Sequence, residues 1–408
     1  MNTLILLFLA FSSFLAPSAV AQDGIPDDWA PWRDPKNPNV IVLDKNDPSK
    51  NVWNLRRDTS KDAKREPGLV NVQRYAAGFS SMGAFPTFLA APMAFSPKDL
   101  KAGGVEVAIV GLNIDDNLIA GGRYAANQLR ALTDVTGFGG PAYDPHMHLD
   151  YIKSLVIADY GNVASHYGHS ERSIEEVHKV ISEILSADAM PLAMGGSHLQ
   201  MYPMITALAK KYGTKSFAIV HVDAHYDAMT IGFGRYVHNG RMISQAVERG
   251  IINGSDIIQV ALRSASPGTD DLKWMQKNGL RFHYYSEIRN KGFKAVMQRV
   301  LDEVKGKKLF ISFDMDGIDP AYAAAVGTQE PEGLTASDAM QLMRALGIQN
   351  ELVAVEINEW NPLLDDKHQT TGILMDRLMR SVLAGIAARK KGIKDPFYVA
   401  PTGLDYKK

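Results

Sequence analysis

The sequence predicts an α/β protein with three layers, in which helices cover both faces of a mostly parallel β-sheet. The first observation is a set of short apolar runs rich in β-branched residues, which is typical of strands buried on both faces. The second is that amphipathic helical stretches separate these runs over roughly 300 residues. With 46% hydrophobic residues in 408, the chain has apolar material for one large core or two modest ones. The regular alternation favours one domain.

The individual elements follow in chain order. The first strand is expected at 105–114 (VEVAIVGLNI), and a helix is expected after it at 121–134. An amphipathic helix at 174–185 (IEEVHKVISEIL) precedes an apolar run at 189–196. The remaining pairs are helix 201–213 with strand 216–225, helix 294–306 with strand 308–319, and helix 336–347 with strand 351–358.

The first residues have the features of a secretory signal peptide. An apolar run from Leu4 to about Leu15 is too short to span a bilayer as a helix. Ala19, Val20 and Ala21 then supply a small-x-small cleavage site. We therefore predict export to the periplasm or medium, with an uncleaved membrane tether as the alternative, since no Lys or Arg precedes the apolar run.

The rest of the chain divides into three further segments. Residues after the cleavage site are rich in Pro, Asp, Asn and Lys and predict an extended arm. The predicted layout is a signal peptide at 1–21, an arm at 22–76, a catalytic domain at 77–395 and a tail at 396–408.

Charge and cysteine content limit the class of partner. The net charge is −1, and the 44 basic residues are scattered, so neither nucleic acid nor an anionic membrane is expected as a partner. The chain has no cysteine, which excludes disulfides, thiolate metal sites and a Cys nucleophile. A small-molecule substrate and oxygen or nitrogen ligands are expected instead.

Carboxylate and imidazole side chains follow two of the expected strands at alternating positions. The run HVDAHYDAM places Asp223, His225 and Asp227 directly after an apolar strand, and KLFISFDMDGID contains Asp314 and Asp316. Ligand sites of parallel α/β sheets lie beyond the carboxyl ends of the strands. If the extended backbone continues there, alternating residues project to one side and face a common point.

A third expected strand adds an imidazole to this edge, because it ends in Gly195 and Gly196 and is followed by His198. So many carboxylates at one sheet edge would repel one another without cations. A mixed Asp and His set without thiolates favours Mn²⁺, with Fe, Ni, Co or Zn as competitors. More than four ligands suggest two bridged ions.

These runs and their surroundings resemble the ureohydrolases, the arginase and agmatinase superfamily, and most closely its agmatinase-like branch. The matching segments are VAIVGLNIDD, GGRYAANQLR, MPLAMGGSHLQMYP, IVHVDAHYDA, YVHNG, ISFDMDGIDP and AVEINEWNP. They cover roughly residues 75–390. The resemblance implies an arginase-like fold for the domain at 77–395.

The resemblance also implies a cofactor of two Mn²⁺ ions per chain, with Ni²⁺ or another divalent ion as an alternative. The ligands of one ion would be His198, Asp223, Asp227 and Asp314. Those of the other would be Asp223, His225, Asp314 and Asp316, so that Asp223 and Asp314 bridge the pair.

Such a centre suits hydrolysis of a guanidinium group, which is planar and accepts nucleophiles poorly. Two cations that share a water depress its pKa enough to supply hydroxide near neutral pH. Asp227 is placed to orient this nucleophile, and by resemblance His238 would carry a proton to the departing amine. Glu356 resembles the family's guanidinium-binding glutamate, since a carboxylate can accept two N–H groups of that cation. Ordinary surface positions are the alternatives for His238 and Glu356.

The chain departs from the family pattern at three positions. Ser197 and Leu199 flank His198 where the family usually has Asp and Ser, which removes a carboxylate beside a metal ligand. Asn239 is inserted between His238 and the following glycine. Trp360 either stacks on a cationic substrate or, as the more common case, packs in the core.

The predicted function is therefore hydrolysis of a guanidino compound to urea and an amine, most simply agmatine to putrescine. Guanidinobutyrate, guanidinopropionate, arginine and free guanidine are alternative substrates that the sequence does not separate. Other classes that we considered are a metal-dependent amide hydrolase such as an acetylpolyamine deacetylase, a non-catalytic binding protein and a dinuclear phosphoesterase. By resemblance, a homo-oligomer is expected, as a trimer or hexamer.

Overall fold

The computed structural model describes residues 65–72, 86–116, 120–136, 143–166, 168–230, 238–265 and 268–401. The predicted signal peptide at 1–21 lies outside these residues, as do most of the predicted arm at 22–76 and the end of the predicted tail at 396–408. In the described part of the chain, no helix is long and apolar enough to cross a lipid bilayer.

The centre of the fold is an eight-stranded sheet with the strand order β4-β1-β5-β10-β9-β6-β7-β8. All neighbouring strands in it are parallel, so their carboxyl ends meet at one edge. The predicted α/β class is confirmed. The strands are β1 (Val107–Gly111), β4 (Ile157–Asn162), β5 (Met190–Met194), β6 (Phe217–Val222), β7 (Ile257–Leu262), β8 (Arg281–Tyr284), β9 (Lys308–Asp314) and β10 (Glu351–Asn358).

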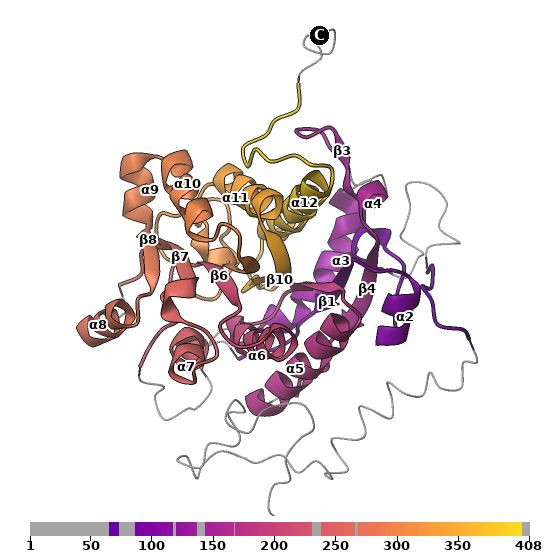
Figure 1. Cartoon of the computed structure of the whole chain (residues 1–408), viewed down its shortest axis with the longest axis horizontal. Coiled ribbons are helices and arrows are strands. Elements are labelled where there is room, and N and C mark those ends of the chain that lie inside the picture. Colours follow the sequence, from indigo (N-terminus) through magenta and orange to yellow (C-terminus); the bar gives the residue numbers. More distant parts are fainter. Residues whose placement is uncertain are drawn as a thin grey trace, which may run out of the picture. The chain divides into compact units, whose positions relative to one another are not determined.

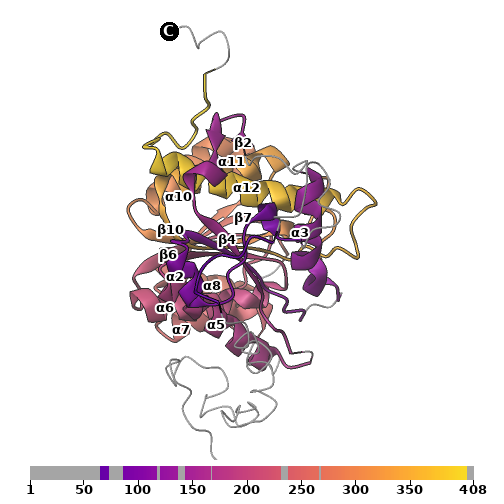
Figure 2. The ribbon, with the colours of Figure 1, turned by 90° about the vertical axis from the view of Figure 1, so that its right-hand side faces the viewer.

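Helices cover both faces of this sheet, as Figures 1 and 2 show. On one face lie α5 (Ser170–Ser186), α6 (Met201–Tyr212) and α7 (Met242–Glu248). On the other lie α3 (Ala125–Thr136), α10 (Phe293–Glu303), α11 (Ala336–Gln349) and α12 (Thr370–Lys390). Shorter helices are α2 (Pro97–Ala102), α4 (Tyr151–Ser154), α8 (Thr269–Lys277) and α9 (Tyr285–Lys291), and a small hairpin pairs β2 (Tyr143–Asp144) with β3 (Leu149–Asp150).

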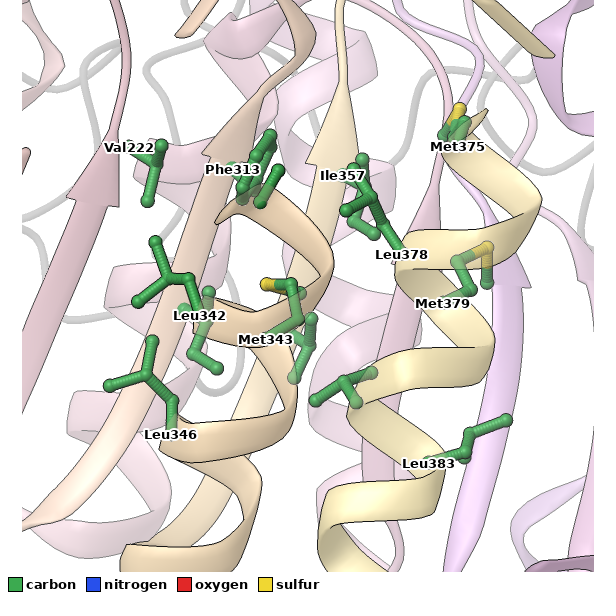
Figure 3. Close-up of a cluster of buried hydrophobic side chains, with 14 of the residues drawn as sticks. Val222, Phe313, Leu342, Met343, Leu346, Ile357, Met375, Leu378, Met379 and Leu383 are labelled. Carbon is green, nitrogen blue, oxygen red and sulfur yellow. The ribbon is translucent and has the colours of Figure 1, made fainter. Parts of the chain in front are cut away.

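The hydrophobic core between the sheet and the second helix layer supports the central strands (Figure 3). Val222, Phe313 and Ile357 lie at the ends of β6, β9 and β10 and are fully buried. Leu342 and Met343 of α11 pack in the same cluster, as do Leu378 and Met379 of α12. Burying side chains of this size stabilises the fold by about 1.5–3 kcal/mol each. The packing fixes the strand ends from which the polar side chains project.

Three strands at or near the two sheet edges, β4, β7 and β8, were not predicted from the sequence. The six apolar-rich residues of β7 (IIQVAL) cannot be told from a buried helix segment by periodicity alone. The edge strand β8 is only partly buried, and β4 ends in Gly-Asn, a turn signal. In the structure, β4 is held by a buried ion pair, in which Arg130 Nε and Asp159 Oδ2 are 2.8 Å apart.

Candidate metal centre

His198 reaches the carboxyl edge of the sheet on a sharp turn that follows β5. Gly195 and Gly196 have φ angles of 81° and 78°, in the region that favours glycine. A Cβ atom at Gly196 would lie 2.3 Å from Leu112 O, so a larger residue does not fit. A 3₁₀ turn, η5 (His198–Gln200), then begins, and Ser197 Oγ accepts a hydrogen bond from Leu199 N at 3.3 Å. The two residues that depart from the family pattern thus have local structural roles, Ser197 as a cap and Leu199 as a buried apolar side chain.

The segment after β6 does not continue as an extended strand, contrary to the expectation from alternation. The strand ends at Val222, and Asp227 has a φ of 44°, a left-handed backbone conformation that is uncommon for a residue other than glycine. The turn, and not a period of two, therefore brings Asp227 to the same point as Asp223. Such backbone strain is found preferentially at functional sites.

Four side chains from three strand ends converge on one point. The Nδ1 atom of His198 lies 3.1 Å from one oxygen each of Asp223, Asp227 and Asp314. Among the residues that the structure describes, His198 Nδ1 and Asp223 Oδ2 are nevertheless buried without a hydrogen-bond partner. Buried polar atoms are normally satisfied, so one nitrogen and several carboxylate oxygens directed at a shared point fit the ligand set of a divalent cation.

A second group of potential ligands adjoins the first and shares one residue with it. His225 Nδ1 lies 3.0 Å from Asp316 Oδ2 and 3.4 Å from Asp223 Oδ1. Asp223, His225 and Asp316 thus form a group whose ligand atoms are close enough to hold a metal ion. The structure therefore brings all six residues that were predicted as ligands into two adjacent clusters that meet at Asp223.

The carboxylates of these clusters perturb one another strongly. Burial, followed by repulsion from Asp316 and Asp223, raises the pKa of Asp314 well above its ordinary value. Burial and the nearby Asp223 raise the pKa of Asp316 to about 6. Holding several carboxylates in one buried place is unfavourable unless cations offset their charge. The raised pKa values and the geometry therefore both favour a cation site.

A row of four buried polar side chains crosses the sheet beneath the clusters, and sequence reasoning missed three of them. Neighbouring strands pair Glu356 with Ser312, Ser312 with His221, and His221 with Gln259. All four residues are fully buried. Ser312 precedes Asp314 by two positions and His221 precedes Asp223 by two, so each lies on the ligand-bearing face of its strand. We call these four residues the polar row.

The polar row contacts the ligands directly. Ser312 Oγ lies 2.8 Å from His198 Nε2 and donates a hydrogen bond to Glu356 Oε1 at 2.7 Å. His221 stacks on the ring of His198 with centroids 5.0 Å apart, and its Nε2 lies 3.2 Å from Asp223 Oδ2. His221 Nε2 could itself be a metal ligand. On the other side of the ring, Gln259 Nε2 lies 3.2 Å from His221 Nδ1, so the polar row holds this ring in place beneath the cluster.

The position of Glu356 differs from the one its expected role requires. Its side chain is fully buried behind His198, and burial raises its pKa to about 7. No face of Glu356 is open to a substrate, so its geometry favours orienting His198 through Ser312 over binding a guanidinium group. Glu359, one residue past the end of β10, is slightly exposed, and its Oε1 accepts a hydrogen bond from His198 N at 2.7 Å. Its φ of 67° marks a second strained backbone position at this edge.

His238 directly precedes a 3₁₀ turn whose backbone is bonded to the segment that contains Asp227. Hydrogen bonds from Met229 N to Gly240 O, at 2.8 Å, and from Ile243 N to Asp227 O, at 3.1 Å, tie the two segments together. His238 Nδ1 accepts a hydrogen bond from Gly240 N at 3.0 Å. Asn239 begins the 3₁₀ turn η6 (Asn239–Arg241) that makes this contact possible.

Trp360 packs in the core and does not face the cluster. It is fully buried, its Nε1 donates to Asp365 Oδ2 at 2.9 Å, and a Cβ atom at Gly372 would lie 2.3 Å from its ring. The stacking role that we considered for it is therefore wrong.

Comparison with known proteins agrees with the fold. The sequence profile of the arginase family matches residues 105–385. The chain belongs to the arginase family. Every ligand candidate in the two clusters lies inside the matched region.

Relatives of this arginase-family chain include enzymes named for different guanidino substrates. It is 31% identical over 312 residues to a guanidinobutyrase of Pseudomonas aeruginosa, covering 75% of this chain and 95% of the relative. It is 29% identical to a mitochondrial agmatinase of Gallus gallus, covering 71% of this chain and 84% of the relative. Its fold matches the crystal structure of a hypothetical agmatinase from Burkholderia thailandensis with a TM-score of 0.68 at 24% identity, covering 80% of this chain and 99% of the other.

Proposed function

We propose that this chain is a metal-dependent amidinohydrolase that cleaves a guanidino compound into urea and an amine. The observation that carries the proposal is the convergence of His198 Nδ1 and three aspartate oxygens, with buried polar atoms that lack partners within the described part of the chain. Bound divalent cations would supply a water of lowered pKa, which is what attack on a guanidinium carbon needs near neutral pH. The donor set of carboxylates and imidazoles suits two Mn²⁺ ions, with Ni²⁺ as an alternative.

The remaining chemical roles fall to residues around the cluster. Asp227 is placed to accept a hydrogen bond from the attacking water, because its carboxylate lies in the first cluster. His238, which precedes the turn bonded to the Asp227 segment, would pass a proton to the departing amine, which leaves only when it is protonated. We propose Glu359 in place of Glu356 as the carboxylate that holds the guanidinium cation, since Glu359 lies past the strand end.

We propose agmatine as the first substrate, with putrescine and urea as products. Relatives are named both agmatinase and guanidinobutyrase, so guanidinobutyrate is the main alternative. The expected cellular form is an exported homo-oligomer, a trimer or hexamer, and gel filtration with light scattering on the purified chain measures its assembly.

Urea release across a substrate panel tests this proposal. The full chain, loaded with Mn²⁺ or Ni²⁺, is incubated with agmatine, guanidinobutyrate, guanidinopropionate, arginine and free guanidine. We expect urea from at least one of them, with a stoichiometric amine product. If none yields urea while metal remains bound, hydrolysis of amide substrates such as acetylated polyamines becomes the favoured function.

A further inference from the structure

Arg263 lies one residue past the end of β7, beside the second ligand cluster, and has no role yet in the proposed reaction. Its side chain is partly buried, and its backbone N–H donates a hydrogen bond to Ala224 O at 3.0 Å. Ala224 lies between Asp223 and His225 in the chain. Its own N–H donates to Asp316 Oδ1 at 3.0 Å. Through Ala224, Arg263 is therefore joined to the backbone of the second cluster.

The guanidinium group of Arg263 bonds to two separate segments of the chain. Its Nη2 donates to Asp316 O at 2.7 Å and to Glu330 O at 3.0 Å. Its Nε donates to Pro331 O at 3.0 Å. The planar fork of a guanidinium group can meet several carbonyl oxygens at fixed angles, which the single ammonium group of a lysine does not reproduce. Arg263 therefore ties the loop that contains Glu330 to the segment that contains the ligand Asp316.

The loop held by Arg263 places a carboxylate behind a predicted metal ligand. His225 Nδ1 faces the cluster, 3.4 Å from Asp223 Oδ1 and 3.0 Å from Asp316 Oδ2. On the other side of the ring, His225 Nε2 lies 3.7 Å from Glu330 Oε1, which is longer than a hydrogen bond but within the range of an ion pair. Ligand histidines usually have a carboxylate or carbonyl at the second ring nitrogen, and this partner fixes the orientation of the ring. Glu330 is therefore placed to orient His225.

The backbone of this loop has a strained conformation that needs support from the rest of the chain. Glu332 has a φ of 66°, in the left-handed region, and Gly333 has a φ of 139°. A Cβ atom at Gly333 would lie 2.5 Å from Asp319 N, so the loop packs closely on the segment after β9. Strained turns persist only where surrounding contacts hold them. Loss of the Arg263 contacts should therefore displace Glu330.

The ligands that belong to the first cluster alone have different supports. His198 Nε2 lies 2.8 Å from Ser312 Oγ in the polar row. Asp227 O accepts a hydrogen bond from Ile243 N at 3.1 Å. The contacts of Arg263 described above fall instead on the second cluster and its loop. A change at Arg263 should therefore affect one metal ion more than the other.

We propose that Arg263 and Glu330 are positioning residues that hold the second cluster in the geometry that binds its metal ion. Arg263 fixes the backbone of Asp316 and the loop beside it, and Glu330 orients the ring of His225. The inference rests on the proposed two-ion hydrolase and adds the residues that would determine whether its second ion is bound.

Binding of Mn²⁺ by the full chain tests this inference. After removal of metal with a chelator and dialysis against Mn²⁺, the wild-type protein should take up about two ions per chain. R263K keeps the positive charge but loses the planar fork. It should weaken the binding of one ion by about 10–100-fold and leave the other within about threefold of its wild-type affinity. Electron paramagnetic resonance should then show isolated Mn²⁺ at concentrations that give a coupled pair in the wild-type protein.

Variants of Glu330 test the second half of the inference. E330A should weaken binding of the same ion by about tenfold. E330Q should restore part of the affinity, because its amide oxygen can still accept a hydrogen bond from His225 Nε2.

Matched controls make the same kinds of change at the surface. E351Q and R299K alter side chains that are 53% and 54% exposed and that form surface ion pairs with Lys308 and Glu287. Both affinities should stay within about twofold in these variants, because exposed ion pairs contribute little. Thermal unfolding of the metal-free proteins reports any general loss of fold.

The outcomes separate this inference from the function on which it rests. Unchanged affinities in R263K and E330A, or equal losses at both ions in R263K, overturn the inference and leave the hydrolase function intact. A selective loss in R263K, combined with no urea from any guanidino compound in the wild-type protein, supports the inference and overturns the function. A wild-type protein that holds a single ion per chain overturns the two-ion centre and this inference with it.

Discussion

Replacing Asp223 with Asn is expected to reduce urea release by about 10³-fold or more. Asp223 contacts both ligand clusters, because its two oxygens lie 3.1 Å from His198 Nδ1 and 3.4 Å from His225 Nδ1. Metal ions contribute several kcal/mol of transition-state stabilisation, and about 1.4 kcal/mol corresponds to a tenfold change in rate. Because an amide is a poor bridging ligand, the loss should appear in kcat and should persist at saturating substrate. Steady-state urea assays on the two proteins measure it.

A matched control separates the loss of the site from a general effect of the substitution. D188N makes the same change at an aspartate whose side chain is 79% exposed and whose contact is an ion pair with Lys211. Its activity should stay within a factor of about two, because exposed ion pairs contribute little. Retention of more than a tenth of the activity in D223N would rule out Asp223 as a bridging ligand.

The second large effect is expected from the polar row. S312A and E356Q should each weaken metal binding by about 10–100-fold, the usual consequence of removing a group that orients a ligand. Ser312 connects His198 to Glu356 through contacts of 2.8 Å and 2.7 Å, so the two residues act through one hydrogen-bonded chain. The double variant should therefore lose little more than the worse single variant, in contrast to independent sites. Competition with a metal-sensitive chelator measures the affinities.

A second buried serine provides the control for this experiment. S381A removes a hydroxyl from a buried serine of α12, far along the chain from the ligands, and should leave metal affinity unchanged. Excess metal should restore urea release in S312A, because the catalytic groups remain in place. Unchanged affinity in both single variants, or losses that add in the double variant, would contradict the role of the polar row.

The ligands could be predicted from the sequence because their pattern is local. Asp223, His225, Asp314 and Asp316 follow apolar strands within a few residues, and parallel strands must end at one edge. The way they converge could not be predicted in this manner. The left-handed turn at Asp227 depends on tertiary contacts, and no residue type at that position signals it.

The polar row behind the ligands was harder to predict from the sequence. A signal for His221 and Ser312 did exist, since each lies two positions before a ligand aspartate in a strand. Pairing Glu356 with Ser312 requires the strand order, in which β10 lies beside β9. That order results from crossover connections, which a single sequence does not reveal. The choice between Glu356 and Glu359 depended on knowing the strand order.

Metal content and activity measured in one titration test the central claim most directly. The full chain is stripped with a chelator and then titrated with Mn²⁺, while elemental analysis gives ions per chain and an agmatine or guanidinobutyrate assay gives urea release. We predict no urea from the stripped protein, activity that rises with bound metal, and two ions per chain at saturation. Full urea release from the stripped protein would contradict the account. So would a wild-type protein that binds no more metal ions per chain at saturation than D223N does.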